Sequence, residues 1–398
     1  MEQHEASPDM DRPKAAVFND PKIRGLIYQT VLLLAVVYLA YVGIGNVSGN
    51  LRKAHIASGF GFLGNPAGFA ISQSLVPYNE GVSTYFDVYL VGLLNTLLVS
   101  VLGVIAATVL GFIVGVCRLS TNLVVRGVAT IYVEAFRNIP LLLHIFIWYF
   151  GVMRLLPVPR ESMKLGSFAL LNNRGVFVPR PILGDLSWAT ASAFAIGIVA
   201  WIVLSRWSAT RQRRTGHRFP VLWPSLGLVI LLPLLVFVLT GAPLRFDYPK
   251  LGTFEPSGGI AILPELIALF LALTSYTAAF IAEIVRAGIM SVSKGQTEAA
   301  YALGLRPSPA LRLVVIPQAM RVIIPLLTSQ YLSLMKNSSL AVAIAYPDLV
   351  SVFAGTALNQ TGQAVEIIAM TMVTYLGISL LTSAGMSWYS AQKSWMER

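Results

Sequence analysis

The sequence predicts an all-α fold, a polytopic bundle of about eight membrane-spanning helices. Hydrophobic residues make up 56% of the 398 residues and charged residues only 12%, and the mean hydropathy is +0.70. A soluble domain carries about 25% charged residues, roughly twice this share. Several apolar stretches also exceed the ~20 residues that a helix needs to cross a bilayer. The composition therefore excludes an ordinary soluble domain and predicts a membrane protein.

Hydropathy divides the chain into eight candidate spans. The first 25 residues are polar and charged, so the first span, at 26–45, is expected to be a retained anchor and not a cleaved signal peptide. The stretches 46–87 and 154–187 are rich in residues that favour turns and are expected to be loops. The other seven spans are expected at 88–117, 127–153, 188–205, 220–241, 260–290, 320–345 and 363–390.

The distribution of charge predicts the orientation of these spans. The net charge of +11 does not indicate nucleic-acid binding, because the basic residues are spread between the apolar stretches. An even number of spans places both termini on one side, and Lys and Arg favour that side two to one, with the cluster Arg211–Arg218 as the clearest example. The positive-inside rule then predicts cytoplasmic termini. The basic segment 154–187 is an exception on the outer side.

Few residues suit a disulfide, a metal site or a catalytic centre. Cys117 is the only cysteine, which excludes an internal disulfide, and the four histidines have no metal-ligand spacing. The chain has no phosphate-binding G-x-x-x-x-G-K-[ST] loop and no nucleophile elbow. We therefore expect no enzymatic activity, no metal and no cofactor in this chain, and any ATP hydrolysis in another subunit.

A polar segment between the sixth and seventh spans carries an ordered motif. Glu298-Ala299-Ala300 is followed by Gly304 and then by Val314-Val315-Ile316-Pro317. We expect two short helices here, the first from Lys294 to Leu305 and the second starting at Pro309 with Ser308 as its N-cap.

This segment, 298–317, resembles the EAA loop of ABC importer permeases. That loop has EAA, three residues, Gly, nine residues and I-x-L-P, and here Val314 and Ile316 stand at the Ile and Leu positions. In that family the loop connects the membrane domain to a separate ATPase subunit. The resemblance implies that the coupling contacts involve Glu298, Ala299, Ala300, Gly304, Ile316 and Pro317.

Three further segments resemble the polar amino-acid permeases of that family. The second span contains GLLNTLLVS and ends in RLS, the third begins IYVEAFRNIPLLLHIFIWYFG, and the sixth contains SYTAAFIAEIVRAGIMSVSKGQTEAA. The resemblance covers 88–153 and 260–390. It implies a bacterial inner-membrane importer subunit for amino acids that works with an ATPase dimer, a second permease chain and a periplasmic amino-acid-binding protein.

The extended amino terminus, the long loop and the two-span insert resemble those of the larger permeases of general L-amino-acid systems. This resemblance implies broad specificity and the pairing of two different permease chains. The expected organisation has permease core at 88–153 and 260–390. Around this core we expect a cytoplasmic segment (1–25), an extra span with an outer loop (26–87), an inserted loop with two spans (154–259) and a C-terminal tail (391–398).

Ionisable residues within spans are functional candidates, because charge is expensive in lipid. Glu134 and Arg137 are three residues apart and share a helix face. Either they neutralise each other as a structural pair near the cytoplasmic end, or Arg137 lies close enough to the cavity to meet a substrate carboxylate. Pro140 follows this pair and is expected to kink or break the helix at that point. Glu283 and Arg286 repeat this spacing, and we favour a structural or gating ion pair over substrate contact.

Other polar residues are candidates for the substrate pathway. Lys336, Asn337 and Ser338 offer donors for a substrate carboxylate, although Lys336 could instead pair with a glutamate. Asn138, Tyr276 and Thr277 complete the candidate pathway. 

Three features have mainly structural interpretations. His144 is expected to be a packed, hydrogen-bonded histidine, and Gly111-x-x-x-Gly115 indicates close helix packing. Asp348 follows Tyr346-Pro347 and is expected to be an exposed acid at the outer mouth.

Two other classes of function compete with the permease interpretation. An ion-coupled secondary amino-acid transporter acting alone would show internal symmetry between its halves, which the sequence lacks. A membrane-embedded enzyme would need a cluster of acids, histidines or a nucleophile.

Overall fold

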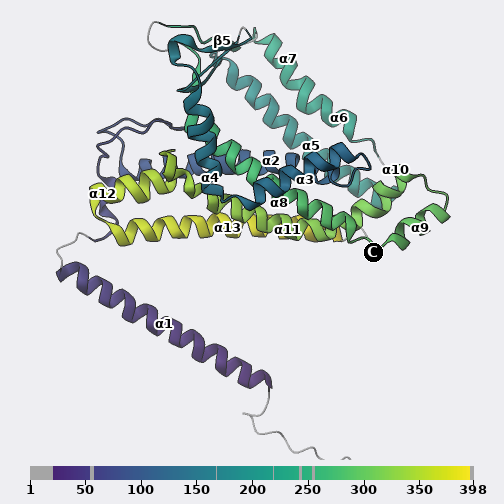
Figure 1. Cartoon of the computed structure of the whole chain (residues 1–398), viewed down its shortest axis with the longest axis horizontal. Coiled ribbons are helices and arrows are strands. Elements are labelled where there is room, and N and C mark those ends of the chain that lie inside the picture. Colours follow the sequence, from purple (N-terminus) through teal and green to yellow (C-terminus); the bar gives the residue numbers. More distant parts are fainter. Residues whose placement is uncertain are drawn as a thin grey trace, which may run out of the picture.

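The computed structural model describes residues 21–53, 58–166, 168–217, 219–241, 244–252 and 256–394, and long helices dominate it (Figure 1). Residues 1–20 of the predicted N-terminal segment and residues 395–398 of the predicted tail lie outside this description. The helices are α1 (Pro21–Lys53), α2 (Tyr85–Cys117), α3 (Leu123–Asn138), α4 (Leu141–Phe146), α5 (Ser187–Thr215), α6 (Leu222–Leu226), α7 (Leu232–Leu239), α8 (Pro264–Met290), α9 (Lys294–Ala302), α10 (Pro307–Ala310), α11 (Ile316–Asn337), α12 (Leu358–Thr361) and α13 (Ala364–Ser394).

Seven helices in the described part of the chain are long and apolar enough to cross a membrane. The number rises to eight if the bent pair Leu123–Asn138 and Leu141–Leu155 forms one span. The predicted bundle of about eight spans is therefore confirmed. Helix α1 lies apart from the other helices in Figure 1, and none of its apolar window is buried.

Helix α8 is the centre of the bundle, with 61% of its apolar window buried. It contacts α2, α3, α4 and α11, and α13 packs on α11. The contact between α2 and α8 is close because α2 presents glycines: a Cβ on Gly111 would lie 2.6 Å from the Cβ of Ile281, and one on Gly115 would lie 2.8 Å from the carbonyl oxygen of Ala282. The close packing predicted from Gly111-x-x-x-Gly115 is confirmed.

Local sequence signals set several helix ends. Thr84 caps α2 in a capping box, since its hydroxyl accepts the N–H of Asp87 at 3.3 Å while its own N–H donates to the Asp87 carboxylate at 2.8 Å. The Asn122 side chain caps α3. Pro140 ends α3, because proline disfavours helical conformation in the preceding residue, and the chain bends by 107° before α4. The predicted break at Pro140 is confirmed.

The predicted coupling segment, 298–317, has one separate helix and not two. Helix α9 ends at Ala302 before Gly304, whose φ of +80° suits glycine. From Pro307 the chain is helical without interruption to Ile344, through α10, a π-helical turn and α11, so the predicted second short helix with Ser308 as its N-cap is wrong. Pro317 lacks the N–H that would continue the α-helical ladder, and the π-helical turn just before it accommodates this loss.

The expected loop at 154–187 is largely folded into strands. Four strands form an antiparallel sheet in the order β1-β2-β3-β6, and β4 pairs with β5. Gly175, at φ +121°, allows β3 to meet β6, because a Cβ there would lie 2.0 Å from the carbonyl oxygen of Ile262. The strands are β1 (Met163–Leu165), β2 (Ala169–Asn172), β3 (Gly175–Val178), β4 (Arg180–Leu183), β5 (Leu244–Asp247) and β6 (Ile260–Ile262).

Together with α5 to α7, these strands form a unit beside the core bundle (Figure 1). Helices α5 and α7 contact each other, and β6 leads directly into α8. Because β6 precedes the first residue of α8 and α9 follows its last, the strands and α9 lie toward opposite ends of α8. We name these two ends the strand end and the coupling end.

Candidate functional site

The coupling segment projects from the bundle at one end (Figure 1). Glu298, Ala299 and Gly304 are exposed, whereas Ala300 is buried. No atom lies within 4 Å of a Cβ placed on Gly304, so this face is open to another surface. Ile316 is 42% exposed and Pro317 is half-buried.

The segment is also tied to the core. The N–H of Leu305 donates to the Ala300 carbonyl at 3.1 Å, and the amide of Gln318 on α11 donates to Gln296 on α9 at 3.0 Å. A force on α9 therefore reaches α11 through a direct contact as well as through the chain.

Four charged side chains form an ion cluster at the coupling end. Arg118, which caps the C-terminus of α2, donates to the Glu283 carboxylate of α8 and lies 3.9 Å from the Glu134 carboxylate of α3. Glu283 also accepts from Arg286 at 2.6 Å and 3.3 Å. The pairing of Glu283 with Arg286 is as predicted, but Arg118 at its centre was missed.

The predicted pair of Glu134 with Arg137 is not the contact that forms. Glu134 faces Arg118, and the guanidinium of Arg137 lies 5.2 Å above the ring centre of Phe280. Arg137 and Asn138 are both exposed. The two side chains diverge because the Glu134 carboxylate faces Arg118 at the end of α2. The i, i+3 spacing within α3 gives no information about this contact with another helix.

A second group of polar side chains is buried within the bundle. The helical path from α11 breaks after Ile344, where Ala345 adopts a left-handed conformation at φ +59°, and a π-helical stretch, η9 (Leu349–Ala357), starts at Asp348. Non-glycine residues adopt this conformation at a free-energy cost of about 1–3 kcal/mol, which the surrounding packing must offset. Broken spans of this kind occur where the backbone lines a cavity or is buried in protein.

Asp348 is buried at this break, so the expectation of an exposed acid at the outer mouth is wrong. It is 0% exposed, and its Oδ1 accepts the N–H of Ser351 at 2.8 Å as the N-cap of η9. Its Oδ2 has no hydrogen-bond partner in the protein. The chain returns Asp348 into the bundle against α2, and this return is a tertiary feature that the local sequence does not reveal.

Polar groups from three other elements surround Asp348. The Asn95 amide donates to the carbonyl of Pro347 at 2.9 Å, and the Thr96 hydroxyl accepts the N–H of Leu349 at 3.0 Å. The Tyr375 hydroxyl of α13 lies next to Asp348, Ser338 and Thr96, at positions outside good hydrogen-bond geometry. We call the following set the midspan polar cluster: Asn95, Thr96, Ser100, Ser338, Asp348 and Tyr375.

The depth of this cluster follows from helix geometry. Thr96 lies eleven residues after Tyr85, the first residue of α2. At 1.5 Å per residue this is about 16 Å from the start of a helix of 33 residues, so the cluster lies well inside α2. Asn95 Oδ1 and Ser100 Oγ also lack partners in the protein. A buried carboxylate at this depth with unpaired neighbours is suited to a cationic, hydrogen-bonding ligand.

The other predicted pathway residues are spread over several places. Ser338 is 0% exposed and belongs to the midspan polar cluster, but Lys336 is exposed and Asn337 half-buried. Thr277 is buried in α8, and Tyr276 is half-buried beside His144. The structure therefore brings Ser338 to Asp348 and leaves Lys336 outside that cluster.

His144 has the packed, hydrogen-bonded environment that the sequence predicts. Its ring is 4% exposed, stacks on Phe136 at 4.9 Å, and its Nε2 lies 3.2 Å from the Phe136 carbonyl oxygen. Among the described residues, no three His, Cys, Asp or Glu side chains converge as metal ligands would.

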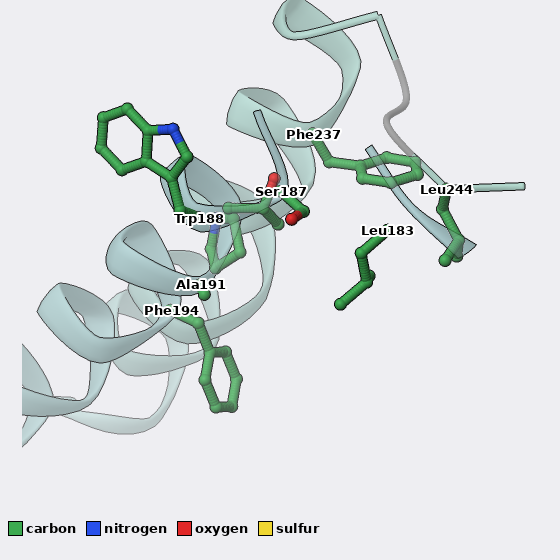
Figure 2. A pocket seen from close by; sticks show the side chains of 9 residues that line it. Leu183, Ser187, Trp188, Ala191, Phe194, Phe237 and Leu244 are labelled. Carbon is green, nitrogen blue, oxygen red and sulfur yellow. The ribbon is translucent and has the colours of Figure 1, made fainter. Parts of the chain in front are cut away.

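The unit formed by α5 to α7 contains an apolar hollow of about 520 Å³. Figure 2 shows Leu183, Phe237 and Leu244 around this space, with Ala191 and Phe194 on the adjoining helix. The polar side-chain groups of its lining residues are the hydroxyls of Ser187 and Thr190 and the indole N–H of Trp188. Without a charged group it is poorly suited to a zwitterion, in contrast to the midspan polar cluster.

Similarity to characterised proteins is high along the whole chain. Residues 215–394 match the family described as the binding-protein-dependent transport system inner membrane component. The general L-amino acid transport system permease protein AapQ of Rhizobium johnstonii is 52% identical, over 95% of this chain and 94% of that protein. This chain belongs to that permease family.

Two further relatives of the permease cover nearly its full length. The putative amino-acid ABC transporter permease protein YhdX of Escherichia coli K12 is 51% identical over 96% of this chain and 97% of its own length. The glutamate/glutamine/aspartate/asparagine transport system permease protein BztB of Rhodobacter capsulatus is 42% identical over 98% and 99%. The permease is thus a membrane subunit of an ABC transporter, and the secondary-transporter alternative is not supported.

Arg118, Asn95 and Asp348 are the functional candidates that sequence reasoning missed or misplaced. Asp348 had a usable signal, since it is the only acid between Glu298 and Glu366 in a strongly apolar region. Arg118 directly follows the second span and was counted only as a loop charge.

Proposed function

We propose that the permease moves L-amino acids of broad specificity across the bacterial inner membrane. The observation that carries this proposal is the buried Asp348 carboxylate, whose Oδ2 has no partner in the protein at the middle of the bundle. An α-ammonium group is common to all amino acids and would complete its hydrogen bonding. The printed names of AapQ and BztB support amino acids as the substrate class.

Specificity would be broad because the midspan polar cluster would bind the ammonium and carboxylate groups that all amino acids share. Besides Asp348 its members are neutral: an amide, a phenol and three hydroxyls. The hydroxyls of Thr96, Ser100 and Tyr375 can donate to the substrate carboxylate, whereas the Asn95 amide and the Ser338 hydroxyl already donate to carbonyl oxygens. None of these neutral groups selects for or against a charged substrate side chain. The roles predicted for Arg137, Asn138, Tyr276, Thr277, Lys336 and Asn337 in the pathway stay part of this proposal, at positions further from Asp348.

The coupling segment, 298–317, is proposed to receive a separate ATPase dimer at the cytoplasmic end. Its exposed Glu298, Ala299 and Gly304 support this assignment, since small residues let another surface approach closely. A second, different permease chain, as the resemblance to general L-amino-acid permeases implies, and a periplasmic binding protein at the strand end would complete the complex. Both termini would then be cytoplasmic, as the charge distribution predicts.

Purification of the tagged permease from native membranes tests this proposal directly. Mass spectrometry is expected to identify an ATPase subunit and a second permease in fixed stoichiometry. In proteoliposomes that contain the purified complex and its binding protein, uptake of several L-amino acids should require ATP inside. Recovery of the chain alone, active without ATP, would refute the proposal.

A further inference from the structure

The ion cluster at the coupling end joins three helices that differ in how firmly they are packed. Helices α2 and α8 form one rigid pair, because the glycines of α2 leave no space at Ile281 and Ala282. Helix α3, in contrast, fully buries only Ala129 and Val133, and it is joined to α8 by the hydrogen bond from the Tyr132 hydroxyl to the Ser275 carbonyl at 2.7 Å. An element with few buried side chains separates from its neighbours at a lower free-energy cost than a core helix.

Arg118 makes contacts of two different kinds across these helices. Its contact with Glu283 lies inside the rigid pair, and the side chains of Arg118 and Glu283 are 11% and 25% exposed. Its contact with Glu134 of α3 is long, at 3.9 Å, and the Glu134 side chain is 57% exposed. The contact with Glu283 is therefore the stronger one and the contact with Glu134 is easily broken.

The same cluster leads directly to the coupling segment. Arg286, bound to Glu283, also donates to the sulfur of Met290, the last residue of α8, and α9 starts at Lys294. Helix α3 leads into the 107° bend at Pro140 about one turn after Glu134, so its start at Leu123 is the end farther from the bend. Movement of α9 would thus act on the helix pair that holds Arg118, while α3 can pivot at the bend.

We propose that Arg118 is a positioning residue of the transport cycle and that its contact with Glu134 is a latch. In one state the latch holds α3 against the α2–α8 pair, and when the ATPase moves the coupling segment the contact opens and α3 swings away. Arg118 keeps its contact with Glu283 throughout. This inference rests on the proposed coupling to an ATPase.

The Glu134→Gln substitution removes the charge of the latch at an exposed position, so the protein is expected to fold. In the reconstituted complex, ATP hydrolysis without substrate should rise about two- to fivefold, the range expected when an exposed ion pair is lost. Uptake per ATP hydrolysed should fall. Arg126→Gln, an equally exposed change on α3, should leave both rates unchanged.

A distance measurement tests the motion itself. Spin labels on Val128→Cys, which is exposed on α3 away from the bend, and on Ala287→Cys of α8, in a Cys117→Ser background, should move apart when ATP binds to the wild-type complex. With Glu134→Gln, the longer distance should already be populated without nucleotide. If wild-type uptake requires ATP but Glu134→Gln matches it in distance distribution and ATPase rate, the latch is refuted while the proposed function stands.

Discussion

Replacement of Asp348 by Asn separates a role in transport from a role in folding. The change keeps the shape of the side chain and removes its charge. Asn caps helices about as well as Asp, so the bond from the Ser351 N–H, 2.8 Å long, should remain. Since Oδ2 has no partner in the protein, loss of a buried, unpaired charge should not lower the thermal stability of the complex.

Transport, unlike thermal stability, should fall strongly in Asp348→Asn. Removing one partner of a buried ion pair costs about 3–5 kcal/mol, because the other charge is left unpaired. At 1.4 kcal/mol for each factor of ten, ATP-dependent uptake should fall roughly 100-fold or more for acidic, basic and neutral amino acids alike. The assay is uptake in proteoliposomes at saturating binding protein.

A substrate analogue adds a readout that a structural role would not change. An α-hydroxy acid lacks the ammonium group, so the wild-type permease should discriminate against it at the membrane step, and Asp348→Asn should lose most of this discrimination. Asp185→Asn, at an exposed position outside the bundle, is the control and should transport normally. Wild-type uptake and unchanged discrimination in Asp348→Asn would refute the assignment of the ammonium site.

Two further substitutions test the coupling segment and the helix contact. Gly304→Glu should abolish ATP-coupled uptake without loss of the protein from the membrane, because it adds a charged side chain to an open face. Gly304→Asn should retain most uptake, because Asn tolerates the φ of +80°. Normal uptake by both variants would contradict the coupling role. Gly111→Leu should destabilise the protein by about 1–3 kcal/mol or more in thermal unfolding, since its Cβ alone would lie 2.6 Å from Ile281. The control Gly103→Ala should be tolerated, because its Cβ meets only the flexible Leu334 side chain at 3.3 Å.

Sequence reasoning succeeded where the signal is local or compositional. The apolar spans, the break at Pro140 and the pairing of Glu283 with Arg286 all depend on residues within a few positions of one another. The Gly111-x-x-x-Gly115 packing was also predictable, because two glycines one turn apart leave a flat helix surface.

It failed where partners lie far apart along the chain. Arg118 and Glu283 are separated by 165 residues, and the pairing of β3 with β6 joins the two ends of the unit that contains α5 to α7. No periodicity or spacing reports such contacts. The expected pair of Glu134 with Arg137 was wrong for this reason. The expected loop at 154–187 was wrong although β1, β2 and β3 pair locally, because these short strands stand among turn-forming residues.

The sequence by itself determined that the chain crosses a membrane, and it predicted 298–317 as the coupling segment, since hydropathy and motif order are properties of contiguous residues. Only the tertiary structure decided where Asp348 lies. A proline and an acid after an apolar helix are compatible with an exposed turn, and burial follows from the return of η9 against Asn95 and Thr96 of α2. Which charges are buried together depends on packing between distant segments, and that packing places a carboxylate in the middle of this bundle.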